Sequence, residues 1–375
     1  MARERALSTS LSASGDVAHS FEPLRGYIES RIEEGLVPGV VVAVGRRSLF
    51  HQAALGHRAL APRTEPMSLR TIFDLASLTK PMVTGALAAE LACAGILDLD
   101  DPVERHLEET RGTDAGSLPL RMLLTHTAGL PAMNPLADYS GGKPRLFAAI
   151  AREPLEARPG ERFTYSDVGY ILVQGVLERV TRKRLDRLAR EKIFDPLHFR
   201  DTRFGTRAAD LVRVAPTTRL HGDRGPWLRG RVHDPRARSR ALGGVAGHAG
   251  VFGTAEEAAR FCAMLLQRGL AGPRRILRPE AVRLMTTNQC EPPVTVRRGI
   301  GFDIESPYAA PRGSLFSSDS YGHTGFTGVS LWIDPRNDAY FVLLTNSLHA
   351  GGHKDLKAFR ARAATLAARA LGIGG

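Results

Sequence analysis

The sequence predicts an α+β fold in which one antiparallel sheet is built from both ends of the chain. Two observations lead to this expectation: strand-like runs lie near both termini, and helical apolar spacing dominates the middle of the chain. The 375 residues are 43% hydrophobic and 24% charged, which is an ordinary globular composition. Disordered, collagen-like and coiled-coil proteins are thereby excluded.

The N-terminal part is expected to supply a flexible start, a helix and a hairpin. Residues 1–20 are rich in Ser and Ala, and residues 21–36 repeat an apolar residue every four positions, as an amphipathic helix does. Residues 39–56 combine a β-branched run with flanking glycines, which predicts two strands joined at 45–47.

The rest of the chain is expected to hold a helical lobe, at about 76–242, and the second part of the sheet lobe, which spans about 21–75 and 243–375. Together these form one catalytic domain over 21–375. Helices are predicted over 77–95, 170–188, 255–269 and 355–371, and strands over 298–305, 327–333 and 339–345.

The charge and the cysteines limit the possible partners. Fifty-one Lys and Arg against 39 Asp and Glu give a net charge of +12, which by itself would suit a polyanion such as nucleic acid. The arginines are scattered, however, and neither an RNP-like aromatic motif nor a basic helix is present, so no nucleic-acid partner is expected. The three cysteines form neither a disulfide framework nor a zinc pattern, and no metal is expected.

The first twenty residues lack the apolar core of a signal peptide, and no run is long enough to span a membrane. As the sequence stands, the protein is expected in the cytoplasm without integral membrane association. A different true start would make a periplasmic or exported protein possible.

Ser77 and Lys80 form an S-x-x-K pattern at the start of a predicted helix. Three residues of separation put the hydroxyl and the ammonium on one helix face. A desolvated lysine can accept the proton of a serine and so activate it as a nucleophile. A helix-capping serine beside an exposed lysine would give the same pattern. Against that alternative, Lys80 is one of only six lysines in an arginine-rich chain, and arginine cannot lose its proton.

Two further motifs contain candidate site residues. Tyr165 and Asp167 lie on a loop before the helix at 170–188, where a tyrosine near a lysine can relay protons. A buried tyrosine and a helix N-cap aspartate are the structural alternative. His323, Thr324 and Gly325 precede the strand at 327–333, where a glycine would let a substrate approach the backbone. An ordinary glycine-rich turn is the alternative there.

The three motifs occur in the order S-x-x-K, Y-x-N or a variant, and K/H-T-G. In this order they resemble those of the serine β-lactamase and penicillin-binding-protein superfamily. The chain is similar to its class C β-lactamase-related branch, which includes D-alanyl-D-alanine carboxypeptidases, family VIII esterases and penicillin-binding protein 4-like hydrolases. The segments that carry the resemblance include FDLASLTKPMVT, LLTHTAGLP, FTYSDVGYILVQGVLERVT, GGVAGHAGVFGT and GHTGFTGVSLWIDP.

The resemblance implies a β-lactamase/transpeptidase-like fold and a set of roles. Ser77 would be acylated, with Lys80 and Tyr165 transferring protons. The backbone N–H groups of Ser77 and Phe326 would form the oxyanion hole. Asp167 stands where the family has asparagine.

His323 stands where the family has lysine, so the permanent positive charge that would face a penicillin carboxylate is missing. The expected function is therefore that of a serine hydrolase acting through an acyl-enzyme on short esters or D-Ala-terminated peptides, with weak or no β-lactamase activity. The substrate would be a small molecule or a peptidoglycan peptide, and no cofactor is implied. A catalytically inactive relative that binds cell-wall fragments is the alternative. The oligomeric state is left open.

Overall fold

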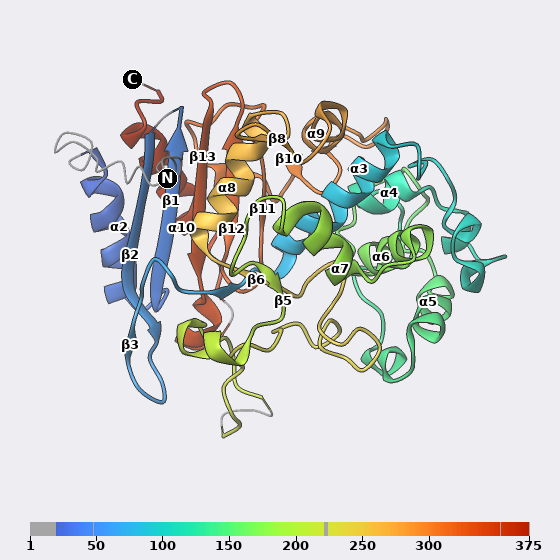
Figure 1. Ribbon diagram of the computed structural model, residues 1–375, viewed down its shortest axis with the longest axis horizontal. Helices are drawn as coiled ribbons and strands as arrows, with labels where there is room; N and C mark the ends of the chain where they lie inside the picture. The colour runs from blue at the N-terminus through green and yellow to red at the C-terminus, as the bar shows by residue number, and fades with distance from the viewer. Residues whose placement is uncertain (1–19, 48, 221–223, 353, 375) are drawn as a thin grey trace, which may run out of the picture.

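The computed structural model describes residues 20–47, 49–220, 224–352 and 354–374. Residues 1–19, almost all of the predicted flexible start, lie outside this part. The chain forms a large sheet with helices on both faces and a mostly helical region beside it (Figure 1). This is the α+β arrangement expected from the sequence.

The large sheet is antiparallel, with its eight strands in the order β3-β2-β1-β13-β12-β11-β10-β9. It joins the two ends of the chain, because β1 pairs with β13 so that Val40 lies opposite Thr345. The strands are β1 (Gly39–Arg46), β2 (Leu49–Ala59), β3 (Glu65–Pro66), β9 (Arg297–Arg298), β10 (Asp303–Glu305), β11 (Tyr321–Thr324), β12 (Ser330–Asp334) and β13 (Ala339–Thr345).

Helices cover the sheet and form the region beside it (Figure 1). Among the described residues, no helix combines the length and the apolar character that crossing a membrane requires. The α-helices are α2 (Glu22–Glu33), α3 (Ala86–Cys93), α4 (Leu120–Thr125), α5 (Lys143–Ala151), α6 (Asp167–Thr181), α7 (Leu185–Ala189), α8 (Ala255–Leu266), α9 (Pro279–Thr286) and α10 (Lys357–Ala370).

The two faces of the sheet bury separate clusters, because successive strand residues point to opposite sides. On one face, Val42 and Leu343 pack with residues of α2 and α10. On the other face, Val41 and Leu344 belong to the main core, which includes α8 and extends into the helical region. At the centre of that region α6 is buried all round from Val168 to Leu177, as expected for a central helix.

The predicted elements are present, but turns divide several of them. The predicted helix over 77–95 consists of a 3-10 turn at Ala76–Leu78, a π-helical segment at Lys80–Gly85 and then α3. Pro81 lies within the π-helical segment, where its missing N–H removes a helical hydrogen bond. The helix predicted over 170–188 is α6 and α7, separated at Arg182, which has φ 54°.

The strands near the predicted site are also shorter than expected. The run at 298–305 is divided into β9 and β10, with Gly301 at φ +89° between them. The run expected from 327 begins only at Ser330, because Gly325 to Gly328 form a turn in which Gly328 N–H donates to Gly325 O at 3.1 Å. A small second sheet, β4-β6-β5, is formed by β4 (Phe73–Asp74), β5 (Arg203–Phe204) and β6 (Val251–Gly253).

Candidate active site

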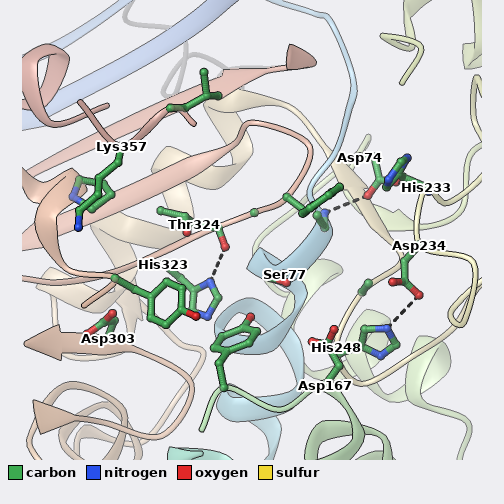
Figure 2. A pocket seen from close by; sticks show the side chains of 18 of the residues that line it. Asp74, Ser77, Asp167, His233, Asp234, His248, Asp303, His323, Thr324 and Lys357 are labelled. Atoms are coloured by element: carbon green, nitrogen blue, oxygen red, sulfur yellow. Dashed lines mark hydrogen bonds and ion pairs between the residues drawn. The ribbon is translucent and has the colours of Figure 1, made fainter. Parts of the chain in front are cut away.

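A cavity of about 740 Å³ lies where the turn after β4, the start of α6 and the end of β11 meet (Figure 2). In Figure 2, His323 and Thr324 lie on one side of Ser77, and Asp167 and His248 on the other. Lys80 is fully buried behind Ser77. The other predicted site residues all line the cavity: Ser77, Tyr165, Asp167, His323, Thr324, Gly325 and Phe326.

Ser77 sits on a tight turn that Asp74 holds in place. The preceding residue, Ala76, has φ +45°, a conformation that costs a non-glycine residue about 1–3 kcal/mol. Asp74 Oδ1 accepts the Ala76 N–H at 2.9 Å, and its Oδ2 accepts the His233 N–H at 2.7 Å. Burial raises the pKa of Asp74 to about 6. The strained turn is therefore tied to a buried carboxyl group two residues earlier.

Lys80 makes three contacts with its ammonium group. Its Nζ lies 3.0 Å from Ser77 Oγ, 2.7 Å from Asp167 Oδ1 and 3.3 Å from the carbonyl oxygen of His248. The π-helical segment and the start of α6 thus bring the serine, the lysine and the aspartate together. This contact between Ser77 and Lys80 is the one that the S-x-x-K spacing predicted.

Asp167 determines the charge of Lys80. Burial by itself lowers the pKa of Lys80, but the Asp167 carboxylate and the neighbouring Tyr165 outweigh burial, and the pKa is raised above its usual value. Lys80 is therefore an ammonium ion in the resting site. The sequence left open whether Asp167 caps α6; the cap is Ser166, whose hydroxyl accepts the Gly169 N–H at 3.3 Å.

Tyr165 is half-buried, with its ring centroid 4.8 Å from Lys80 Nζ. The ring stacks on His126 at 4.4 Å between centroids. His126 in turn accepts the Ser166 N–H on Nδ1 at 3.0 Å, which fixes the loop that carries the tyrosine. The structure therefore places Tyr165 beside Lys80, as a proton relay requires.

His323 is a buried, neutral side chain. Its Nδ1 donates to the Thr324 carbonyl at 2.7 Å, which leaves Nε2 as an acceptor. Burial, together with the positive charges of Arg298 and Lys80, lowers its pKa well below 6.5. The charge that a histidine at this position could gain by protonation as pH falls is therefore suppressed by its surroundings.

The turn after His323 and Thr324 packs directly against the turn of Ser77. A Cβ added to Gly325 would lie 2.5 Å from Val329 Cγ2, 3.0 Å from Leu75 O and 3.2 Å from Ala76 Cβ, so a larger residue would push these groups apart. Thr327 Oγ1 donates to Asp74 O at 2.8 Å. The two backbone segments of the predicted oxyanion hole are thus joined to each other.

Sequence reasoning missed Asp234, which lies on the cavity wall opposite His323. Its Oδ1 is 3.1 Å from His248 Nε2 (Figure 2). Burial opposes ionisation, but His248 and the Ala237 N–H lower the pKa of Asp234 below its usual value. The segments around both residues resemble the family, yet their separation of 14 positions gave no sign that they pair.

Asp167, Asp234 and His248 could each offer one ligand atom to a metal ion, within 4.8 Å of one another. Lys80 Nζ, however, already lies 2.7 Å from Asp167 and supplies the positive charge of this cluster. That ammonium would repel a divalent cation bound to the same carboxylates. The cluster is therefore better suited to proton transfer than to metal binding.

Arg298 and Asp303 form a second buried ion pair in the cavity wall, with 3.4 Å between Nη1 and Oδ2. The guanidinium also lies over the Phe163 ring, 5.2 Å from its centroid. Because Arg298 helps to lower the pKa of His323, it keeps this side of the cavity free of a protonated imidazole. The sequence showed Arg298 only as one of many arginines.

Comparison with known proteins identifies the family. The family model described as Beta-lactamase matches residues 24–365. The chain belongs to the β-lactamase family. Among curated relatives, this β-lactamase family member is 32% identical over 307 residues to a protein of Escherichia coli (strain K12) named "Putative D-alanyl-D-alanine carboxypeptidase", with 75% of this chain and 70% of that protein covered.

Solved structures confirm the fold of this β-lactamase family member. EstCE1, described as a hydrolase with promiscuous acyltransferase activity, has a TM-score of 0.73 and 24% identity, with 94% of this chain and 98% of that chain covered. A class C β-lactamase from Rhodobacter sphaeroides has a TM-score of 0.70 and 22% identity, with 96% and 98% covered. The match to the family model confirms the superfamily expected from the three motifs, and it is one of serine hydrolases.

Proposed function

We propose that the protein is a serine hydrolase that forms an acyl-enzyme on Ser77 and acts on short esters or D-Ala-terminated peptides. The observation that carries this proposal is the buried Lys80 ammonium 3.0 Å from Ser77 Oγ, at the base of a cavity large enough for a small substrate. An inactive protein that only binds cell-wall fragments would not need this contact.

Acylation begins with the removal of a proton from Lys80, because an ammonium cannot act as a base. Asp167 Oδ1, at 2.7 Å, is placed to take that proton and pass it to solvent, so that the resting ion pair loses one proton before Ser77 attacks. The neutral amine then takes the hydroxyl proton of Ser77 while Oγ bonds to the substrate carbonyl carbon. The leaving alcohol or amine receives a proton from Lys80 or from the Tyr165 hydroxyl as its bond to carbon breaks.

The negative charge that develops on the carbonyl oxygen would be stabilised by the N–H groups of Ser77 and Phe326. Removing one such donor typically lowers kcat by about 10²–10³-fold. Deacylation repeats the sequence with water: Lys80 or Tyr165 removes a proton from the water as it attacks, and Ser77 Oγ regains a proton when it leaves.

Substrate preference follows from the neutral His323 and from the cavity mouth. Without a protonated imidazole, the H-T-G strand offers a penicillin carboxylate no cation of its own. Three exposed apolar side chains, Met133, Tyr308 and Phe326, also line the cavity, whose cations come from elements other than the H-T-G strand. Both features favour neutral acyl donors with an apolar group over β-lactams.

The proposal is tested with a fluorophosphonate probe followed by peptide mapping. Modification of Ser77 that a short ester slows by competition is the expected result. Failure to label any residue, combined with measurable binding of a muropeptide, would instead favour the inactive binding protein. Modification at a different serine would remove Ser77 from the proposed role.

His323 gives a first prediction about substrate choice. Because burial keeps the imidazole neutral, the ratio of penicillin to neutral p-nitrophenyl ester turnover is expected to stay flat from pH 6 to pH 8. Replacing His323 with lysine should raise acylation by penicillin about fivefold or more relative to ester turnover, as an added ion pair of about 1 kcal/mol would. Initial rates on both substrates measure the ratio, with His323→Gln as the uncharged control. A wild-type ratio that rises from pH 8 to pH 6 would show that the imidazole does titrate.

Asp167 gives a prediction about pH dependence. Burial lowers the pKa of Lys80 and the Asp167 carboxylate raises it, so Asp167→Asn removes the larger raising effect and leaves burial opposed only by Tyr165. A smaller fraction of Lys80 is then protonated at any given pH. The acid limb of kcat/KM for an ester should move to lower pH by about one unit or more. A pH–rate profile measures the shift.

The matched control for this profile is Asp195→Asn. That carboxylate is largely exposed and pairs with Arg190 at 3.7 Å on the surface. The acid limb of the Asp195→Asn pH–rate profile should match that of the wild type. An Asp167→Asn limb that does not move, or that moves to higher pH, would show that Lys80 is not the group that must lose a proton.

A further inference from the structure

Arg360 on α10 reaches the turn that follows the H-T-G strand. Its Nη2 donates to the carbonyl oxygens of Gly325 at 3.0 Å and Val329 at 3.2 Å, and its Nε donates to Gly328 O at 3.3 Å. One guanidinium therefore holds three carbonyls of the turn in which Phe326 lies. The contact joins positions 35 residues apart in the sequence.

The Gly325 carbonyl and the Phe326 N–H belong to the same peptide unit. Because that unit is planar and trans, its C=O and N–H point in opposite directions. Anchoring the oxygen of Gly325 on the α10 side therefore fixes the direction of the Phe326 N–H. Gly325 itself is packed against Leu75 O and Ala76 Cβ, so the opposite side of this peptide adjoins the turn of Ser77.

The charge of Arg360 acts on the same peptide. In the part of the chain that the structure describes, no carboxylate lies within ion-pair distance of this guanidinium, and its three hydrogen bonds all go to carbonyl oxygens. Burial lowers its pKa to about 10, so it remains protonated at neutral pH. A cation that donates to a carbonyl polarises the peptide and makes the N–H at the other end a stronger donor.

We propose that Arg360 is a positioning residue for the oxyanion hole. It orients and polarises the Gly325–Phe326 peptide, so that the Phe326 N–H is ready to stabilise the oxyanion formed at Ser77. This inference rests on the proposed function, because the oxyanion hole acts in catalysis only if Ser77 is acylated. It assigns α10, the helix nearest the C-terminus, a part in catalysis through the peptide that Arg360 holds, in addition to the place of Arg360 in the cavity lining.

The test compares Arg360→Gln and Arg360→Lys with the wild type and with Arg362→Gln. Arg362 is an exposed arginine on the same helix and serves as the matched control. For Arg360→Gln we expect kcat on a p-nitrophenyl ester to fall about 10- to 100-fold. That fall does not exceed the one expected when an oxyanion-hole donor is removed altogether. KM should change less than threefold. Arg360→Lys, which keeps the charge but not the three-way contact, should restore part of the rate.

A second measurement separates positioning from general structural support. Phenylboronic acid would add to Ser77 Oγ and form a tetrahedral anion whose oxygen occupies the hole, so its affinity should fall in parallel with kcat/KM in Arg360→Gln. Thermal unfolding of each variant, followed by circular dichroism, reports on the fold. Arg362→Gln should match the wild type in all of these measurements.

Two outcomes would overturn the inference. Unchanged kcat and boronate affinity in Arg360→Gln would show that the turn does not depend on the guanidinium. A fall in kcat that tracks a loss of folded protein, with boronate affinity per folded molecule unchanged, would show a purely structural role. If Arg360→Gln does not fold, the same comparison is made with Arg360→Lys. If a fluorophosphonate fails to label the wild-type protein, that result counts against the proposed function rather than against this inference.

Discussion

Replacing Ser77 with alanine is expected to abolish ester hydrolysis while leaving the fold intact. The cavity contains a single predicted nucleophile, and the turn at Ala76 is held by Asp74 Oδ1, which accepts the Ala76 N–H at 2.9 Å. Losing a nucleophile costs several orders of magnitude in kcat, so activity below about 1% of the wild type is expected. Hydrolysis of a p-nitrophenyl ester measures the rate, and fluorophosphonate labelling should disappear with it.

A neighbouring substitution provides the control for Ser77→Ala. Ser68 lies outside the cavity, with its hydroxyl 3.3 Å from Thr71 Oγ1. The Ser68→Ala variant should still be labelled at Ser77 and should hydrolyse the ester at the wild-type rate. Thermal unfolding of both variants checks that any loss is chemical. Ser77→Ala protein that keeps more than about 1% of the activity would exclude the hydroxyl as the nucleophile.

Replacing Lys80 with arginine is expected to be nearly as damaging as replacing it with alanine. The proposed mechanism needs Lys80 to lose a proton to Asp167 and then to take one from Ser77. A guanidinium stays charged at working pH and cannot do this. We expect kcat/KM to fall by about 10³-fold or more in both variants, because the Ser77 hydroxyl loses its base.

The control for Lys80→Arg is a lysine whose role is only that of a cation. Lys143 pairs with Glu178 at 2.5 Å on α6, away from the cavity. Lys143→Arg should therefore hydrolyse the ester normally. Lys80 is fully buried, so each variant is also tested for folding by circular dichroism before its rate is compared. A folded Lys80→Arg variant with near-normal turnover would mean that the site needs only a positive charge.

Much of the fold could be predicted because local patterns report burial directly. Strand β13 was predicted with the bounds it has, since Ala339–Thr345 is an apolar run that follows a clear turn signal at residues 334–337. Helix α8 was predicted to within a few residues for a similar reason. The errors lie where the chain bends: near Pro81, at Arg182 and in the turn that ends at Gly328. Such bends depend on single residues with unusual backbone conformations, such as Arg182 at φ 54° and Gly328 at φ 121°, which the apolar pattern of a run does not reveal.

The site shows the same division between local and distant information. A separation of three residues was enough to predict that Ser77 and Lys80 touch, because helical geometry fixes it. The charge of Lys80 could not be predicted, because Asp167 approaches from α6 and reverses the effect of burial. For His323, Arg298 and the surrounding burial remove the titration that an isolated histidine would show.

The sequence by itself determined the fold class, the superfamily and the identity of the candidate nucleophile and its partner. These depend on short motifs and on the periodicity of apolar residues, both of which are local. Only the tertiary structure decided which groups are charged and which backbone groups are held in place. Asp234, Arg298 and Arg360 reach the site from segments distant from Ser77 in the sequence. Electrostatic and hydrogen-bond effects depend on distance in space and on exclusion of water, and neither is encoded in the spacing of a motif.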